Sequence, residues 1–298
     1  MSLARSPASL QGAAANVSPP PTSAGRRAPL TVIEPGGWRG LGVAELWSYR
    51  ELLYFLVWRD VKVRYKQTVL GVAWAVIQPL FTMIIFTLVF GAIGGLDRRV
   101  QAPYPVFAYA GILLWTFFSG AVTQSAQSLI ASSHLISKVY FPRLIIPIAA
   151  VGSELVDLGI SCVMMLGLIL GHGLPLTPRA LLLPLFIAAS LVAALGVGTL
   201  LSALTVAYRD FRYVTGFLIQ TWMFVSPVAY PLEVVPERWR LLYAVNPMVG
   251  PIGGCRSALL GLPFAWGPMA VSAASSIALL VLGIAYFRRV ERRFADIV

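Results

Sequence analysis

Residues 55–71 read FLVWRDVKVRYKQTVLG and run directly into residues 71–93, GVAWAVIQPLFTMIIFTLVFGAI. A dense run of charge therefore stands next to the first long apolar segment of the chain, with no proline between them. An apolar stretch of about 20 residues is long enough to cross the hydrocarbon core of a bilayer as a helix. We therefore expect the charged run to stay on one side of a membrane while the apolar segment crosses it.

The composition of the whole chain supports a membrane protein. Its 298 residues are 58% hydrophobic and only 12% charged, about half the charged share of a soluble domain. Six segments are apolar enough to span, at roughly 71–94, 104–131, 145–171, 180–207, 213–230 and 266–287. The fifth is short and ends at Ser226-Pro227, so it is expected to stop or kink before it crosses fully. Backbone polar groups must be paired in lipid, which predicts an all-α membrane protein with six transmembrane helices.

The positions of the basic residues predict the orientation. If the six segments alternate in direction, 17 of the 23 Lys and Arg residues fall on the side that holds both termini. The positive-inside rule then places both termini in the cytoplasm. The net charge of +11 is therefore explained by the orientation of the chain in the membrane and does not indicate nucleic-acid binding. Residues 1–40 are rich in Ser, Pro, Ala and Gly and have no apolar core of signal-peptide length, which predicts a disordered cytoplasmic tail.

The segment that precedes the first span is predicted to be an amphipathic helix over residues 43–67. It mixes Leu, Phe, Trp and Tyr with charges at helical spacing, which suits a helix lying in the lipid headgroup layer. Its second half carries the cations Arg59, Lys62 and Arg64. They either anchor the helix to anionic lipid and set the topology, or belong to a surface that seats a cytoplasmic partner.

Two loops carry more apolar side chains than a simple connection needs. The loop at 132–143 is expected on the cytoplasmic side and to expose its apolar residues, either to a docking partner or to the headgroups. Its candidate residues are His134, Leu135, Lys138, Tyr140, Phe141 and Arg143. The segment at 231–262, expected on the outer side, is cut by Pro and Gly into two short helices, one starting at Pro236 and one at about 251–260. We expect these helices to be re-entrant at the outer leaflet, because irregular backbone at membrane depth must be covered by protein or line a wet cavity.

The third apolar segment contains two acidic residues, Glu154 and Asp157, which share a helix face by their i, i+3 spacing. Ionisable groups inside spans are rare and are usually functional. No basic residue lies at a similar depth in another span, so Gln78, Gln124, Gln127 and Gln220 are the expected partners. Three roles remain open: hydrogen bonds between helices, lining of a transport path, and proton coupling.

Several catalytic motifs are absent. The chain has no G-x-x-x-x-G-K-[ST] loop for nucleotide phosphates and no H-E-x-x-H or G-x-S-x-G sequence. We therefore predict no catalytic residue, no metal site and no cofactor in this chain.

Three blocks of sequence resemble the membrane subunit of type-2 ABC exporters, and in particular those that move lipid-linked polysaccharides such as O-antigen, capsule or teichoic acid. They are ELLYFLVWRDVKVRYKQTVLGVAWAVIQPL, LISKVYFPRLIIP with the following SELVD, and SPVAYPLEVVPERWRLLYAVNPMVGPIGGCRSALLG. Together they extend over about residues 45–261. The chain departs from the usual family pattern at Gly253, Cys255 and Ser257, where small residues replace an acid and aromatics.

The resemblance implies a multi-pass permease of the bacterial inner membrane that is a homodimer and pairs with two copies of a separate ATPase, which would bind ATP and Mg²⁺. The helix containing WRDVKVRYK would be the interface helix that seats this ATPase, the loop from His134 to Arg143 the coupling helix, and residues 231–262 the outer gate. Aromatic faces suit sugars, so the candidate residues for the substrate path and gate are Trp74, Tyr104, Trp115, Phe118, Tyr230, Trp239, Tyr243, Asn246 and Arg256.

Other functions remain possible at this stage. The alternative within transport is a type-2 exporter of a small lipid or a drug. A membrane-embedded glycosyltransferase would need a loop with paired carboxylates, and the nearest approach is Glu233 with Glu237. A proton-driven flippase would depend on Asp157 and would need no ATPase.

Overall fold

The computed structural model describes residues 43–66, 72–138, 141–208 and 210–291, and within these ranges it contains helices and no strands. The disordered tail predicted for residues 1–40 lies outside the described residues. Five helical stretches in this part of the chain are long and apolar enough to cross a membrane. They are Ala73–Ile93, Tyr104–Ala131, Ile145–Gly171, Pro178–Ala207 and Trp266–Glu291. The predicted all-helical membrane fold is therefore confirmed at this level.

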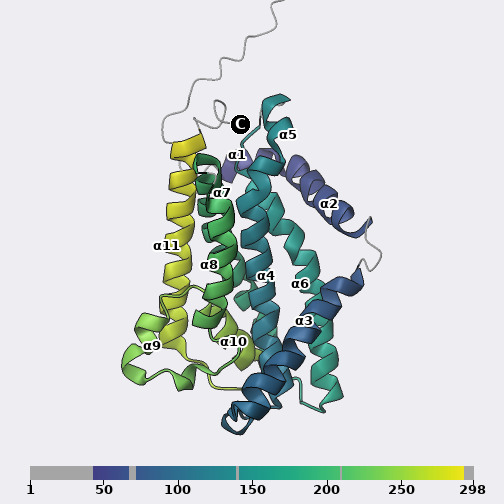
Figure 1. Ribbon diagram of the computed structural model, residues 1–298, viewed down its shortest axis with the longest axis vertical. Helices are drawn as coiled ribbons and strands as arrows, with labels where there is room; N and C mark the ends of the chain where they lie inside the picture. The colour runs from purple at the N-terminus through teal and green to yellow at the C-terminus, as the bar shows by residue number, and fades with distance from the viewer. Residues whose placement is uncertain (1–42, 67–71, 139–140, 209, 292–298) are drawn as a thin grey trace, which may run out of the picture. The chain divides into compact units, whose positions relative to one another are not determined.

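The elements follow one another along the chain with short connections (Figure 1). In order they are α1 (Val43–Ser48), α2 (Arg50–Lys66), α3 (Val72–Phe86), the π-helical turn η1 (Thr87–Ile93), η2 (Leu96–Arg99), α4 (Tyr104–Ala131), α5 (Ser133–Lys138), α6 (Ile145–Gly171), η3 (Pro178–Leu182), α7 (Leu183–Ala207), α8 (Phe211–Val225), η4 (Leu232–Val234), α9 (Glu237–Tyr243), α10 (Val249–Leu260) and α11 (Trp266–Glu291).

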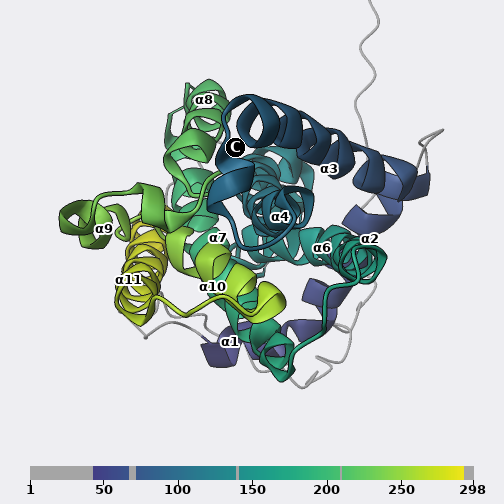
Figure 2. The ribbon, with the colours of Figure 1, turned by 90° about the horizontal axis from the view of Figure 1, so that it is seen from below.

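Helix α4 is the centre of the bundle. It packs against α3, α6, α7, α8 and α10, and the view in Figure 2 shows it surrounded by these helices. Of its most apolar stretch, 78% is buried, against 22% for the corresponding stretches of α3 and α11. An apolar helix can face lipid or protein equally well, so its sequence does not distinguish the central helix from the peripheral ones.

Close packing of α7 against α11 depends on two glycines. A Cβ atom on Gly283 would lie 2.7 Å from Thr199 Oγ1, and one on Gly196 would lie 2.6 Å from the backbone nitrogen of Leu280. Small residues of this kind let helix backbones approach closely in a membrane, where lipid is as apolar as the side chains.

The fifth predicted span is shorter than expected. Helix α8 has 15 residues and ends before Ser226, which corresponds to about 22 Å at 1.5 Å per residue and is less than the roughly 30 Å of a hydrocarbon core. The expectation that this segment stops short is therefore met, whereas the predicted extent of 213–230 is wrong. The backbone then forms α9 and α10, which lie toward the end of the bundle opposite α1 and α5 (Figure 1).

The predicted outer helices have the expected order. Helix α9 begins directly after Pro236, and α10 begins at Val249, two residues before the predicted start. Gly261 ends α10 in the left-handed conformation, with φ of 72°, as is common for a glycine after a helix. Helix α10 is almost entirely buried and packs on α4, α7 and α11.

The predicted helix at 43–67 is two helices, because the chain turns at Tyr49 between α1 and α2. Leu56 of α2 is buried against Ile145 and Ala149 of α6. Four large aromatic residues of this region are more than half exposed: Trp47, Tyr54, Phe55 and Trp58. The expectation of a single helix is therefore wrong, and its location in the headgroup layer stays a prediction.

Candidate functional site

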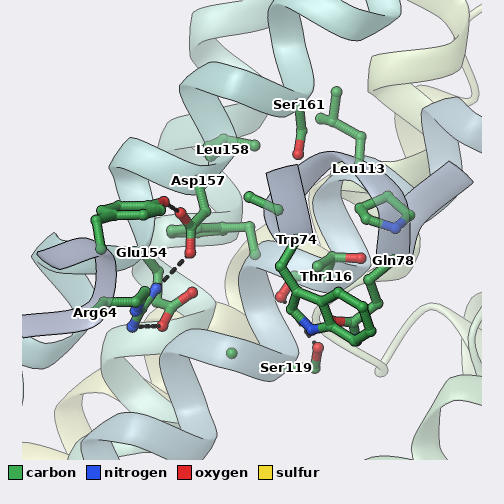
Figure 3. Close-up of a pocket in the computed structure, with 15 residues that line it drawn as sticks. Arg64, Trp74, Gln78, Leu113, Thr116, Ser119, Glu154, Asp157, Leu158 and Ser161 are labelled. Carbon is green, nitrogen blue, oxygen red and sulfur yellow. Dashed lines mark hydrogen bonds and ion pairs between the residues drawn. The ribbon is translucent and has the colours of Figure 1, made fainter. Parts of the chain in front are cut away.

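A cluster of charged side chains connects α2 to α6 (Figure 3). Arg64 in the last turn of α2 forms ion pairs with both Glu154 and Asp157 of α6, and the hydroxyl of Tyr65 donates a hydrogen bond to Asp157 Oδ1. The i, i+3 spacing on α6 places the two carboxylates on one face. The planar guanidinium has enough donors to bind both at once, which an ammonium group does less well.

This cluster corrects the partners expected from the sequence. Glutamine side chains, Gln78 among them, were expected to pair with Glu154 and Asp157, because no other span offers a cation at that depth. The cation instead comes from α2, a helix too charged to span that lies along α6. Arg64 was predicted to act in coupling to an ATPase, but its guanidinium is turned toward the interior helices.

The cluster is largely removed from solvent. The exposed side-chain fraction is 9% for Glu154, 23% for Asp157 and 25% for Arg64. Burial alone lowers the pKa of Arg64, but hydrogen bonds and charge from Glu154 and Asp157 outweigh it and raise that pKa above its ordinary value. Removing one partner of a buried ion pair lowers the stability of a protein by several kcal/mol, because the other charge is left buried and unpaired.

A glycine of α4 makes room for the cluster. A Cβ atom at Gly120 would lie 2.7 Å from Glu154 Oε2, a distance that real Cβ atoms do not adopt. The carboxylate of Glu154 therefore rests directly on the backbone of α4. The cluster thus links three helices: α2 through Arg64, α6 through Glu154, and the central α4 through Gly120.

The charged cluster forms one wall of a cavity of about 620 Å³. Figure 3 shows Trp74 and Gln78 of α3 with Thr116 and Ser119 of α4 facing the cluster across it. Arg64 also lines a second cavity of about 420 Å³, together with Arg59, Gln124, Gln127 and other residues of α2, α4 and α6. Among the residues predicted for the substrate path, Trp74 is the one that lines the first cavity, and Gln78 lies there as well.

The other residues predicted to couple to an ATPase lie on α2 and in or beside α5, and they differ from one another in exposure and pairing. Arg59 pairs with its neighbour Asp60 at 2.8 Å, and Lys62 is exposed. In and beside α5, His134 and Lys138 are exposed and Leu135 is half-buried. Tyr140 lies outside the described residues.

Two residues near Pro142 differ from the sequence-based picture of an exposed loop. Phe141 is only 5% exposed and packs in a cluster with Leu129 and Phe287, so the expectation that it is exposed is wrong. Arg143 donates from Nη1 to the carbonyl oxygen of Glu291 at 2.6 Å. The loop after α5 is therefore tied to the end of α11 by an aromatic side chain and a hydrogen bond.

Arg256, predicted to line the path or gate, is buried inside the chain and holds neighbouring backbone segments together. It lies over the ring of Phe107, with 3.7 Å to the ring centroid. Its guanidinium donates to the carbonyl oxygens of Phe107, Pro227, Val228 and Tyr230. A Cβ atom at Gly111 of α4 would lie 2.6 Å from Arg256 Nη2. This arginine therefore satisfies carbonyl groups that the irregular chain after α8 leaves unpaired.

The aromatic candidates divide into buried and exposed groups. Tyr104, Trp115 and Phe118 of α4 are all buried. The hydroxyl of Tyr104 donates to the Ala229 carbonyl at 2.6 Å, and Phe118 packs edge-on against Trp222. These three residues belong to the core within the chain, and their assignment to a substrate path stays a prediction. Trp239 of α9 is 50% exposed.

Three predicted gate residues make polar contacts in the segment around α9. The hydroxyl groups of Tyr230 and Tyr243 are 2.9 Å apart. The side-chain amide of Asn246 donates to Ser226 Oγ at 2.9 Å, and its Oδ1 accepts from the backbone N–H of Met248 at 3.0 Å. These contacts fix the chain between α8 and α10.

Tyr65, Gly111 and Gly120 are the residues that sequence reasoning missed. Each is ordinary in the sequence, and its role depends on a charged group from a distant part of the chain.

Comparison with known proteins gives a consistent result. A family model described as ABC-2 type transporter matches residues 51–260. The O-antigen export system permease protein RfbA of Myxococcus xanthus is 31% identical over 259 residues, covering 85% of this chain and 98% of that protein. A protein of the same name from Klebsiella pneumoniae is 28% identical over 252 residues, covering 83% and 95%. The polysialic acid transport protein KpsM of Escherichia coli is 22% identical over 68% of this chain and 78% of that protein.

Proposed function

This chain belongs to the ABC-2 type transporter family, and we propose that it is the permease subunit of an ATP-driven exporter that moves a lipid-linked polysaccharide, O-antigen in particular, from the cytoplasm across the inner membrane. The observation that carries the substrate class is the similarity to an O-antigen export permease over 98% of that protein's length. A match of this extent includes the helices that cross the membrane as well as the segments between them.

In this proposal a separate subunit binds and hydrolyses ATP. Membership of the family implies an ATP-binding subunit, and we propose two copies of it, holding ATP and Mg²⁺, against a homodimer of this chain. Exposed cations at one end of the bundle, Lys62 of α2 and Lys138 of α5, are the proposed contacts. This end would face the cytoplasm together with both termini, as the distribution of basic residues indicates.

The arrangement of contacts supports a route for the force. Arg64 ties α2 to α6, and Glu154 rests on α4 at Gly120. A push on α2 would therefore reach the central helix without crossing a flexible segment. Arg64 in this scheme transmits the movement inside the subunit and does not touch the ATPase.

The opposite end would carry the outer gate. We propose that α8 completes the sixth crossing together with the chain around α9 and α10, and that α9 and α10 are re-entrant. In support, α10 is buried by its neighbours, and Arg256 pairs the carbonyl groups at the turn after α8, so little backbone there would be left without a partner in lipid.

Co-purification tests this proposal. The tagged chain is expressed with a candidate ATP-binding ABC subunit from the same organism, and native mass spectrometry of the purified material is expected to show two copies of each. Lys62→Glu combined with Lys138→Glu is expected to release the ATPase, whereas Arg99→Glu, an exposed arginine of η2, is expected to leave it bound. A stable chain that never captures an ATPase contradicts the proposal.

A further inference from the structure

We propose that the 620 Å³ cavity between α2, α3, α4 and α6 is a subsite for the glycan and that it selects uncharged sugar rings over acidic ones. This inference rests on the proposed function and narrows its substrate class. It depends on the side chains that line the cavity, on their charges, and on the pairing of the one arginine among them.

The lining offers the groups that a sugar ring needs. Trp74 of α3 is 56% exposed and presents a flat apolar surface on which the C–H groups of a pyranose can pack. Around it are the amide of Gln78 and the hydroxyl groups of Thr116 and Ser161, which donate and accept hydrogen bonds. Ser119 donates its own hydrogen to the Thr116 carbonyl, so its oxygen is available as an acceptor. An aromatic face beside several neutral polar groups suits a polyhydroxylated ligand.

The charges in the cavity oppose an acidic ligand. Its lining contains one arginine, Arg64, and two carboxylates, Glu154 and Asp157. Because Arg64 is paired with both carboxylates, a uronic acid or phosphate would have to displace one of them to reach the guanidinium. The lining therefore has a formal excess of one negative charge, which repels anions more strongly in a partly buried site than in water.

The carboxylates have spare capacity for hydroxyl groups. Each carboxylate oxygen accepts more than one hydrogen bond, and Asp157 is still 23% exposed while paired. Asp157 is therefore the acidic group expected to accept from sugar hydroxyls, with Tyr65 and Arg64 holding it in position. A lipid tail would offer no hydrogen bonds to the amide of Gln78 or the hydroxyl group of Thr116 in the lining, which disfavours it as the occupant. The volume falls within the range of small-molecule sites.

The test measures binding of two oligosaccharides to this chain in lipid nanodiscs, both with its ATPase bound and without it. The probes are maltoheptaose and an oligogalacturonate of the same length, each carrying the same fluorescent label and measured by equilibrium dialysis. We expect the neutral probe to bind at least roughly tenfold more tightly, since like charges repel one another at close range in a partly buried site. Failure of maltoheptaose to bind, or equal binding of both probes, overturns the inference.

Variants separate the roles of the aromatic ring and the charge. Trp74→Ala is expected to abolish binding of maltoheptaose, whereas Trp266→Ala, which removes a similarly exposed tryptophan from the start of α11, is expected to retain it. Asp157→Asn removes the excess negative charge and is expected to narrow the difference between the two probes. Thermal melting of each variant checks that it is folded. An unchanged preference in folded Asp157→Asn, or unchanged affinity in folded Trp74→Ala, contradicts the inference.

The outcome is distinguishable from a failure of the proposed function. A complex that assembles and exports glycan but shows no preference contradicts the subsite alone. A chain that prefers the neutral probe but never recruits an ATPase contradicts the exporter, while the subsite stands.

Discussion

Two glycines of α4 each give space to a charged group from elsewhere in the chain. Gly120 lies beneath Glu154, and Gly111 lies beneath Arg256. In both cases any side chain at the glycine would occupy the position of a buried charge that is already paired. The sequence contains 26 glycines, and nothing in their local pattern sets these two apart, because the charged groups that they accommodate come from α6 and α10.

Substitution of Gly120 tests whether the charged cluster contributes to stability. Gly120→Ala is expected to push Glu154 away from α4 and weaken its pair with Arg64. Because the pair is partly exposed, we expect a loss of about 2 kcal/mol, below the usual cost of breaking a fully buried pair. That loss corresponds to a fall in melting temperature of roughly 4–8 °C, measured on the detergent-purified protein.

Gly159→Ala is the matched control, because it lies on α6 near the cluster and a Cβ atom there would meet nothing within 4 Å. It is expected to leave the melting temperature unchanged or to raise it slightly, since alanine favours a helix over glycine. Equal effects of the two substitutions would show that Glu154 does not depend on the space at Gly120.

The role of helix α2 depends on its contact with α6. The sequence predicts a charged, aromatic-rich helix before the first span, and the structure agrees, with a break at Tyr49. What the sequence does not indicate is that the last turn of this helix supplies the cation for the acidic pair of α6. A comparison of residue depths among the spans cannot identify this partner, because Arg64 lies on a helix that is not a span.

A disulfide between α2 and α6 tests whether these helices move as one body. A Cβ atom at Gly152 would lie 2.9 Å from Val57 Cγ2, so the pair Val57→Cys and Gly152→Cys is expected to cross-link on oxidation. With Cys162 and Cys255 replaced by alanine, the oxidised protein is expected to keep its transport rate. Arg64→Gln is expected to lower transport per ATP hydrolysed, and the cross-link is expected to restore part of it.

The same cysteine pair can also show that α2 and α6 do not move as one body. If oxidation stops transport and reduction restores it, α2 must slide along α6 during the cycle. The ion pairs of Arg64 would then be contacts that break in the cycle, and the proposed rigid link between α2 and α6 would be wrong.

For the chain as a unit, the sequence predicts where the long helices lie far better than which side chains face one another. The bounds of α4 and α6 agree with the predicted 104–131 and 145–171, because a run of apolar residues of membrane length has few other structures available to it. Tyr104, Trp115 and Phe118 were assigned to a path because sugars favour aromatic rings, yet all three are buried. Their burial follows from the central position of α4, which depends on five other helices.

The central claim is that this chain is a passive conduit powered by another protein through its cytoplasmic helices. The most direct measurement is the ATP-dependent accumulation of a lipid-linked polysaccharide inside sealed proteoliposomes that contain the chain with its ATPase, compared with the chain alone. The account predicts accumulation only when both proteins and hydrolysable ATP are present. Equal accumulation by the chain alone, without nucleotide, would contradict it.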